Sequence, residues 1–249
     1  MKIVIPARYA STRLPGKPLA DICGKPMIAH VWDRAAEALG AADVCVAADD
    51  ERIVDAVKAN GGQAVMTRPD HASGTDRIAE VASLLGWADD EIVVNVQGDE
   101  PLMPPALIGV VGNALASANG AAMATASTRI HVGADVLNPN IVKVVTDASG
   151  LAHYFSRSPI PHLRGADLPD TAAFNYQRHI GIYAYRVSTL KALTALPPAP
   201  LEEAEALEQL RALYNGLAIQ VVEIAEAPPH GVDTPDDLEA VRALMGATA

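Results

Sequence analysis

The first 48 residues, MKIVIPARYASTRLPGKPLADICGKPMIAHVWDRAAEALGAADVCVAA, contain the pattern that decides the fold. Apolar runs at residues 2–5 and 43–48 have strand character, whereas residues 26–39 place apolar side chains at every third or fourth position, which is typical of an amphipathic helix. Gly40 is expected to end that helix. A strand, a helix and a second strand in this order predict two parallel strands joined by a helical crossover.

The same alternation continues to about residue 140. Strand-like runs lie at residues 91–96 and 122–127, and helical patterns lie at residues 51–62, 74–86 and 104–120. We therefore predict an α/β fold in which helices flank a mostly parallel central sheet.

The regular alternation breaks after about residue 140. The expected elements are strands at 142–146, 152–157, 179–186 and 219–224, and helices at 187–196, 201–216 and 234–245. A polar stretch with prolines, residues 158–177, separates two of these strands. We predict one domain over residues 1–249, with a regular α/β half at about 1–140, an inserted smaller lobe at about 141–230 and a terminal helix within 231–249.

The composition argues against several classes of protein. The net charge of -11 is unlike the basic surface that nucleic-acid binding needs. No run approaches 18 uninterrupted apolar residues and the N-terminus lacks the apolar core of a signal peptide, so we expect a cytoplasmic protein that does not enter a membrane. Cys23 and Cys45 lack metal-ligand spacing, and we expect both to be reduced thiols.

The loop after the first predicted strand is basic although the protein is acidic. It carries Arg8, Arg13 and Lys17, but it matches neither the Walker A sequence nor the dinucleotide-binding glycine pattern. A loop that leaves the carboxyl end of a strand lies where open α/β sheets bind ligands, so these cations can donate charge-assisted hydrogen bonds to phosphates. The alternative is a solvated basic loop without a ligand.

Carboxylates follow another predicted strand at the same edge. In VNVQGDEP, residues 94–101, Asp99 and Glu100 come directly after the apolar run. Carboxylates beside a phosphate-binding loop suggest Mg²⁺, which prefers one or two carboxylates together with phosphate oxygens. The alternative is that Asp99 or Glu100 caps the following helix.

A third acidic position lies in HGVDTPDDL, residues 230–238. Thr234 is the expected N-cap of the terminal helix, and Asp236 and Asp237 suit its first turn. Capping therefore explains those two aspartates better than it explains Asp233.

Other polar residues have ordinary structural interpretations as well. His179 begins an apolar strand, Glu208 and Gln209 lie in a helical pattern, and Arg157 follows a strand where any carboxylate can pair with it. The sequence contains no G-x-S-x-G elbow, no HExxH motif and no Cys/His cluster, so serine-hydrolase and zinc-enzyme functions have no support.

Eight motifs, taken together and in this order, resemble one enzyme family. They are IPARYASTRLPGKPL, MTRPDHASGTDR, NVQGDEPLMP, LNPNIVKVV, YFSRSPIP, HIGIYAYR, LEEAEALEQLR and GVDTPDDL, and they span nearly the whole chain. The chain thereby resembles the 3-deoxy-manno-octulosonate cytidylyltransferases, or CMP-Kdo synthetases. The resemblance implies a Rossmann-like nucleotidyltransferase fold, a cytoplasmic homodimer, and transfer of CMP from CTP to Kdo for lipopolysaccharide synthesis.

The resemblance also implies roles for individual residues. Arg8, Arg13 and Lys17 would bind the CTP triphosphate, and Asp99 and Asp233 would hold Mg²⁺; of these, Arg13, Lys17, Asp99 and Asp233 would form the catalytic group. The cytidine would lie among Pro6, Ala7, Arg68, Ser73 and Gly74. Kdo would be bound by Gln97, His179, Glu208 and Gln209, with Arg157 and Tyr183 nearby.

Two other functions remain open from the sequence. A cytidylyltransferase for a related acidic sugar, such as 8-amino-Kdo or a sialic acid, would share the nucleotide half and differ around His179 and Glu208. A nucleotide-binding regulatory protein on the same fold would bind CTP without releasing pyrophosphate, but it would have no need of a second metal carboxylate.

Overall fold

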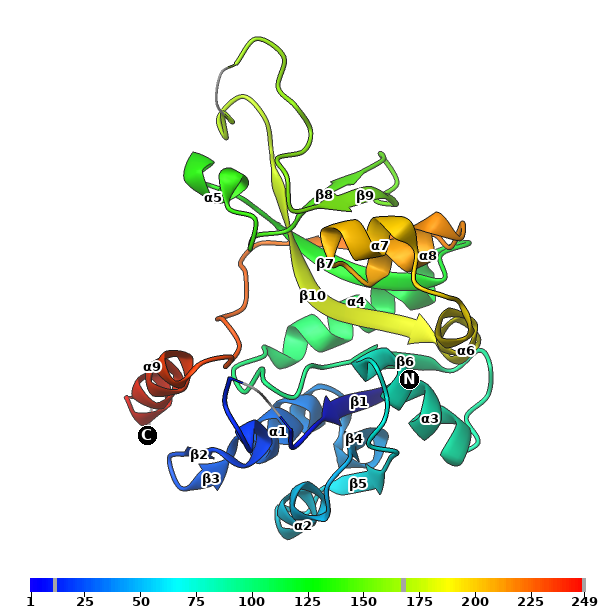
Figure 1. Cartoon of the computed structure of the whole chain (residues 1–249), viewed down its shortest axis with the longest axis vertical. Coiled ribbons are helices and arrows are strands. Elements are labelled where there is room, and N and C mark those ends of the chain that lie inside the picture. The colour runs from blue at the N-terminus through cyan, green and yellow to red at the C-terminus, as the bar shows by residue number, and fades with distance from the viewer. Residues whose placement is uncertain (11–12, 167–168, 248–249) are drawn as a thin grey trace.

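The computed structural model describes residues 1–10, 13–166 and 169–247, and it has a central sheet with helices on both faces (Figure 1). The sheet runs in the order β11-β7-β10-β6-β1-β4-β5, with β8 paired to β10 and β9 paired to β8. Its strands are β1 (Lys2–Ala7), β4 (Val44–Ala48), β5 (Gln63–Met66), β6 (Ile92–Asn95), β7 (Met123–Arg129), β8 (Lys143–Thr146), β9 (Ala152–Ser156), β10 (Gln177–Arg186) and β11 (Ile219–Ile224). The helices are α1 (Met27–Leu39), α2 (Glu51–Ala59), α3 (Gly74–Leu84), α4 (Pro105–Ser117), α5 (Gly133–Leu137), α6 (Val187–Ala195), α7 (Pro200–Glu205), α8 (Gln209–Tyr214) and α9 (Pro235–Gly246). Two 3-10 turns, η1 (Lys17–Leu19) and η2 (Ala41–Asp43), and a small hairpin of β2 (Asp21–Ile22) and β3 (Lys25–Pro26) complete the described elements.

The pairing of strands confirms the predicted mostly parallel sheet. β1 lies parallel to both β4 and β6, β4 is parallel to β5, and β7 is parallel to β11. β10 is antiparallel to β6, β7 and β8. The parallel order places the ends of β1 and β6 side by side at one edge of the sheet, where loops can form a site.

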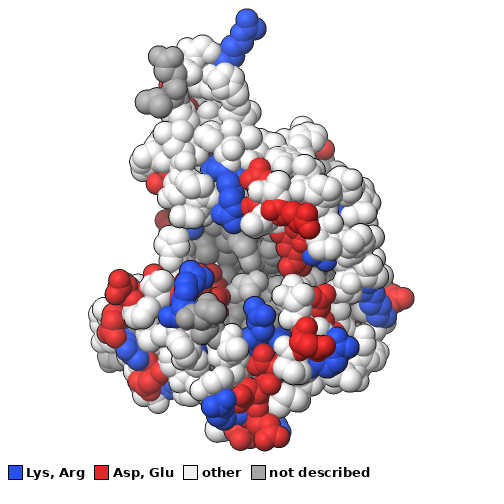
Figure 2. All heavy atoms as spheres, viewed as in Figure 1, with Lys and Arg blue, Asp and Glu red and all other residues white. Residues whose placement is uncertain are grey.

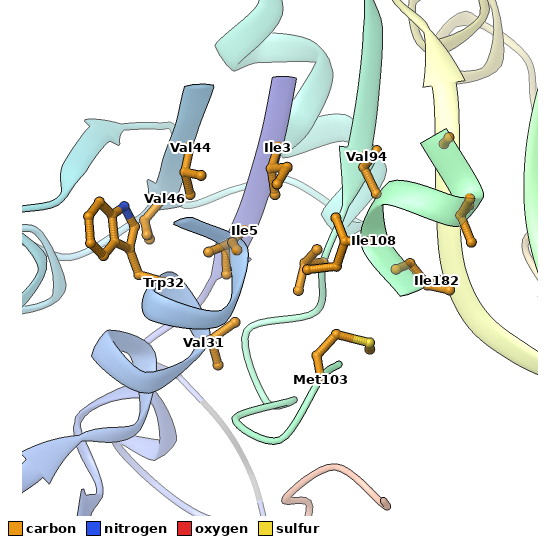
Figure 3. Packing of buried hydrophobic residues seen from close by; sticks show 14 of the residues in the cluster. Ile3, Ile5, Val31, Trp32, Val44, Val46, Val94, Met103, Ile108 and Ile182 are labelled. Atoms are coloured by element: carbon orange, nitrogen blue, oxygen red, sulfur yellow. The ribbon is translucent and has the colours of Figure 1, made fainter. Parts of the chain in front are cut away.

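The core lies in two layers, one on each face of the sheet. Alternate residues of β1 point to opposite faces, so Ile3 and Ile5 pack toward α1, α2 and α4, whereas Val4 packs toward α3. Figure 3 shows Ile5 beside Val31 and Ile108, and Ile3 farther along β1 between Val44 and Val94. Each fully buried aliphatic side chain of this kind contributes about 1.5–3 kcal/mol to folding. This packing makes the central strands a rigid platform for the loops at their ends.

Residues 141–230 do not form a unit separate from the sheet. β8, β9, β10 and β11 all belong to the sheet; β8 and β9 lie at one end of it, and the irregular residues 157–166 and 169–176 project beyond them (Figure 1).

The last helix returns to the N-terminal half of the chain. After β11 the chain descends as an extended segment, and α9 packs beside the β2–β3 hairpin (Figure 1). Leu238 and Val241 of α9 join Ile22 and Met27 in one apolar cluster. This return brings residues near 233 to the loop that follows β1.

The structure differs from the predicted elements in several places, because α5, the β2–β3 hairpin and β5 were not predicted and one predicted helix is broken. β5 was missed because its four residues lie at the edge of the sheet and have an exposed, weakly apolar pattern. The predicted helix at 201–216 is broken into α7 and α8, with Ala206 between them in the left-handed region at φ 50°. Local propensity favours one continuous helix there, so tertiary contacts must impose the break.

Among the described residues, no helix combines the length and apolar character needed to cross a bilayer. Cys23 and Cys45 are free thiols; the first is exposed and the second is buried in β4, where loss of hydration raises its pKa to about 11.

Candidate active site

A cavity of about 460 Å³ opens at the carboxyl ends of β1 and β6. The basic loop after β1, the turn after β6, the start of α3 and the segment before α9 all contribute to its wall. Its lining residues are Pro6, Ala7, Arg8, Ala10, Arg13, Lys17, Pro18, Gly74, Arg77, Gln97, Gly98, Asp99 and Asp233. Figure 2 shows this face of the molecule hollowed between its upper and lower parts, with basic and acidic side chains on the rim.

The Lys17 ammonium is the centre of the charged group in this cavity. Its Nζ donates to Asp99 Oδ2 at 2.7 Å, to Asp233 Oδ1 at 3.1 Å and to the backbone oxygen of Val232 at 2.9 Å. Arg13 Nη2 lies 3.0 Å from the same Asp233 oxygen. Three segments far apart in the sequence are therefore joined by one charge cluster.

Local contacts hold the basic loop in place. Gly16 adopts φ 69° beside the Tyr9 ring, a conformation that glycine tolerates readily, and η1 begins directly after it with Lys17. The Tyr9 backbone N–H donates to Asp49 Oδ1 at 2.9 Å, and the Arg52 guanidinium lies 3.5 Å from the centre of the Tyr9 ring. These contacts fix the positions of Tyr9 and Gly16, between which the loop reaches the cavity.

The acidic residues of the cavity are not helix caps. α4 begins at Pro105 with Pro104 as its N-cap, so neither Asp99 nor Glu100 caps it. At α9, Thr234 and Asp237 form a reciprocal capping box, which leaves the Asp233 carboxylate to bind Arg13 and Lys17.

Glu100 lies beside this charge cluster without lining the cavity. Loss of hydration, followed by the nearby charges of Asp99 and Asp233, raises its pKa to about 7. A Cβ atom at position 231 would lie 2.9 Å from Glu100 Oε1, so Gly231 is needed for the close approach of this segment. The Val232 N–H, in turn, donates to the Asp99 backbone oxygen at 2.8 Å.

The floor of the cavity contains an arginine that the sequence analysis missed. Arg77 of α3 has 0% exposure, and its guanidinium donates to Thr67 Oγ1 at 2.5 Å and to the Arg68 backbone oxygen at 3.2 Å. It also lies 3.3 Å from Asp49 Oδ2. Burial lowers the pKa of Arg77, and the adjacent Asp49 opposes that effect. An arginine in the middle of a helical pattern gives no sequence signal of such a position.

A second, smaller cavity adjoins the first. It has a volume of about 80 Å³ and shares Gln97 with the first cavity. Its lining residues are Thr75, Asn95, Gln97, Met123, Tyr183, Tyr185, Leu193, Glu208, Gln209 and Arg211.

Within the part of the chain that the structure describes, three buried polar atoms of this second cavity have no hydrogen-bond partner. They are Asn95 Oδ1, the Tyr183 hydroxyl and Gln209 Nε2, on residues that are 3%, 9% and 7% exposed. A buried polar group without a partner costs about 1–3 kcal/mol, so three in one small cavity point to a ligand with several hydroxyl groups. Asn95 was also missed from the sequence, because one polar residue at the end of an apolar strand is common.

His179 lies behind Tyr183 rather than in the lining of either cavity. Its Nε2 is 3.0 Å from Thr125 Oγ1, and its ring packs against Phe155 and Tyr183 with centroid distances of 5.0 and 5.4 Å. Burial, followed by the charge of Arg178, lowers its pKa to about 3, so the imidazole is neutral.

Comparisons with known proteins agree with this geometry. A model of the family described as "Cytidylyltransferase" matches residues 2–221. The 3-deoxy-manno-octulosonate cytidylyltransferases of Hahella chejuensis and Marinobacter nauticus are 56% and 57% identical to this chain, over 98% of it and 96% of each relative. The chain belongs to the cytidylyltransferase family.

Solved structures support the fold of this cytidylyltransferase. A CMP:2-keto-3-deoxy-manno-octonic acid synthetase complexed with CTP matches with a TM-score of 0.91 and 47% identity, covering 100% of this chain and 99% of that one. A cytidylyltransferase from Leptospira borgpetersenii, at 16% identity and a TM-score of 0.61, shares the fold alone. The predicted nucleotidyltransferase fold is confirmed.

The structure brings most predicted site residues of the cytidylyltransferase together. Pro6, Ala7, Arg8, Arg13, Lys17, Gly74, Gln97, Asp99 and Asp233 line the first cavity, and Gln97, Tyr183, Glu208 and Gln209 line the second.

Three other predicted residues make different contacts. Arg68 is on the surface, where its Nε donates to Asp70 Oδ1 at 3.1 Å, and the Ser73 hydroxyl caps α3 in a reciprocal box with Asp76. Arg157 donates to the backbone oxygens of Pro139, Glu205 and Ala206. Their predicted contacts with substrates stay predictions.

The residues present fit the magnesium ion that the sequence predicts. Asp99 and Asp233 already share one cation, the Lys17 ammonium, so their carboxylates converge on a position that suits positive charge. The described residues include no group of three or more His, Cys, Asp or Glu side chains arranged to hold a metal by themselves. Two carboxylates completed by substrate oxygens and water are the usual surroundings of Mg²⁺ in nucleotide sites.

Proposed function

We propose that this cytidylyltransferase transfers CMP from CTP to the anomeric hydroxyl of 3-deoxy-manno-octulosonate (Kdo) and releases pyrophosphate. The observation that carries the proposal is the pair of adjoining cavities that share Gln97. One is lined by cations suited to a triphosphate, and the other contains unpaired polar atoms suited to a sugar. Ligands bound in the two cavities would therefore both lie beside Gln97.

The first cavity suits CTP. Arg8, Arg13 and Lys17 supply donors for phosphate oxygens, and the ends of β1 and β6 supply the backbone wall against which the nucleoside lies. A Cβ atom at Gly74 would lie 3.3 Å from Pro6 Cγ, so the start of α3 closes tightly on that wall. We propose that Asp99 and Asp233 hold Mg²⁺ here.

The second cavity suits the hydroxyl groups of Kdo. Asn95 Oδ1 is an acceptor, Gln209 Nε2 is a donor and the Tyr183 hydroxyl is both, so together they match hydroxyl groups, which donate and accept. Partial loss of hydration raises the pKa of the Glu208 carboxyl group beside them. A site built to bind hydroxyl groups rejects analogues that lack them, because its own polar atoms would stay unpaired.

The reaction requires positioning and charge neutralisation more than covalent chemistry. The anomeric hydroxyl oxygen attacks the α-phosphorus and its proton is released to solvent. The new O–P bond forms as the bond to the β-phosphate oxygen breaks, and the electron pair of that bond leaves with pyrophosphate. Lys17 and Arg13 stabilise the negative charge on the phosphates, while Gln97 lies where the two substrates meet. Bound Mg²⁺ would neutralise phosphate charge and lower the pKa of an oxygen that it binds.

The experiment that tests the function measures pyrophosphate release from CTP and Mg²⁺ in four parallel reactions. These contain Kdo, 8-amino-Kdo, N-acetylneuraminate or no sugar. Release with Kdo and little with the others supports the proposal. Release with 8-amino-Kdo or N-acetylneuraminate but not with Kdo would identify that sugar as the acceptor instead. CTP binding without pyrophosphate release in any of the four reactions would favour a regulatory protein.

We also propose that the protein is a cytoplasmic homodimer. Large apolar side chains are exposed around α5 and in the irregular residues 169–176, with Val132, Leu137 and Phe174 at 56%, 48% and 38% exposure, and such surfaces are often buried between subunits. The two free cysteines suit a reducing compartment. Light scattering after gel filtration tests the dimer, with Leu137→Asp expected to give monomers, and cell fractionation tests the location.

A further inference from the structure

Lys143, the first residue of β8, has a fully buried charge that neither cavity uses. Its side chain is 0% exposed, and its Nζ donates to the backbone oxygens of Asn138 at 3.1 Å, Ile141 at 2.6 Å and Arg157. All three donors of the ammonium are therefore occupied. An apolar side chain would fill the same space without the cost of burying a charge, so the position calls for an explanation other than packing.

The Arg157 side chain also donates to backbone oxygens, as the Lys143 side chain does. Its guanidinium donates to the backbone oxygens of Glu205 at 2.6 Å, Pro139 at 3.0 Å and Ala206 at 3.3 Å. The Glu205 carboxylate accepts from the Arg157 backbone N–H at 2.9 Å and from the Ser156 hydroxyl at 2.7 Å. We call Lys143, Arg157 and Glu205 the carbonyl clasp, since its two cations bind six backbone oxygens in all.

The clasp ends at the corner between α7 and α8. Arg157 binds the last carbonyls of α7, and Ala206 then takes the left-handed conformation with φ 50° and ψ 52°. Two residues later, Glu208 and Gln209 line the second cavity. Residues 201–214 are mostly good helix formers, so a continuous helix is the local alternative, and it would turn Glu208 and Gln209 in other directions.

We infer that Lys143 is a positioning residue for acceptor binding: through Arg157 and the α7–α8 corner it holds Glu208 and Gln209 in the wall of the second cavity. This inference rests on the proposed function, because it assigns that cavity to the acceptor sugar. Lys143 itself touches neither substrate. The nucleotide cavity is lined by other elements, so the clasp acts on one substrate and not on the other.

The test is Lys143→Met, which keeps an unbranched side chain, one heavy atom shorter, and removes the three donors of the ammonium. We expect the KM for Kdo to rise about tenfold, because misplacing binding groups by a fraction of an ångström has effects of this order. The KM for CTP should stay within about twofold, since no CTP contact is lost. Lys2→Met is the matched control: it removes the Lys2–Asp43 ion pair of 2.6 Å far from the clasp and should change neither KM.

A second readout does not depend on activity. Hydrogen exchange of the amides at residues 205–210 should become at least about tenfold faster in Lys143→Met, with exchange in α2 unchanged. If Lys143→Met does not fold, Glu205→Gln tests the same clasp, because Glu205 lines neither cavity. Uniformly faster exchange, or equal changes in the two KM values, would show that the clasp merely stabilises the fold and would overturn the inference. Inactivity of the wild-type protein with Kdo would refute the proposed function. The exchange measurement would still show whether Lys143 holds residues 205–210 in place.

Discussion

Substitution of Gly98 by alanine tests whether the cavity depends on contact between the ends of β1 and β6. A Cβ atom built at Gly98 lies 2.6 Å from the Pro6 backbone oxygen, a distance that real Cβ atoms essentially never show. The neighbour is backbone, so no flexible side chain can move aside. The two strand ends must therefore separate by about 0.5 Å or more, at an overpacking cost of about 1–3 kcal/mol.

The separation acts directly on the site, because Pro6, Gln97 and Asp99 lie on either side of the contact. Displacements approaching 1 Å cost up to about a hundredfold in rate, so we expect kcat/KM for CTP to fall about 10- to 100-fold. This corresponds to about 1.4–2.7 kcal/mol of lost transition-state stabilisation.

The assay is pyrophosphate release with Kdo as acceptor, together with thermal unfolding of each variant. Gly109→Ala is the matched control, since Gly109 lies within α4 and a Cβ atom there meets nothing within 4 Å. That variant should be more stable by about 0.5–1 kcal/mol, because alanine favours the helix, and its kcat/KM should be unchanged. A Gly98→Ala protein with near-normal kcat/KM would show that the close approach of the strands is unimportant for the site.

Three further predictions follow from the same cavities. Asp99→Asn should remove most turnover in the presence of Mg²⁺ without lowering Tm appreciably. Removal of Mg²⁺ with a chelator should abolish the activity of the wild-type protein. A near-normal kcat in the variant would exclude Asp99 from the metal site. Lys17→Ala should cost about 2.7–4 kcal/mol of transition-state stabilisation if Lys17 acts on the reacting phosphates, whereas a raised KM for CTP with unchanged kcat would indicate ordinary binding. The contribution of His179 to stability should decrease as pH falls below about 6.5, because an unfolded chain protonates His179 near that pH whereas burial lowers its folded pKa to about 3. The loss from this one group is about 2 kcal/mol at pH 5. Denaturant unfolding should therefore show a smaller change in the free energy of unfolding between pH 7.5 and pH 5 for His179→Phe than for the wild type. An equal change in the two proteins would contradict this account.

Local patterns in the sequence determined much of the architecture. The apolar runs that became β1, β4, β6 and β7 are buried on both faces, and such runs between amphipathic helices leave few alternatives to a parallel sheet. The basic loop and the Asp99 turn were placed at one edge for the same reason, since parallel strands end together. Capping of α9 by Thr234 was also readable, because it depends on neighbours within four residues.

Long-range contacts decided the rest. No local pattern shows that α9 returns to pack beside Ile22, and only this return brings Asp233 to Lys17 across more than two hundred residues. The break at Ala206 runs against helix propensity and follows from hydrogen bonds that Arg157 donates from a distant strand. Asn95 and Arg77 gain their significance only from burial beside a cavity, which depends on several elements packing together. The sequence by itself determined which segments form strands, helices and charged loops, whereas tertiary packing determined which of their side chains meet, because each such meeting is set by contacts between segments far apart in the chain.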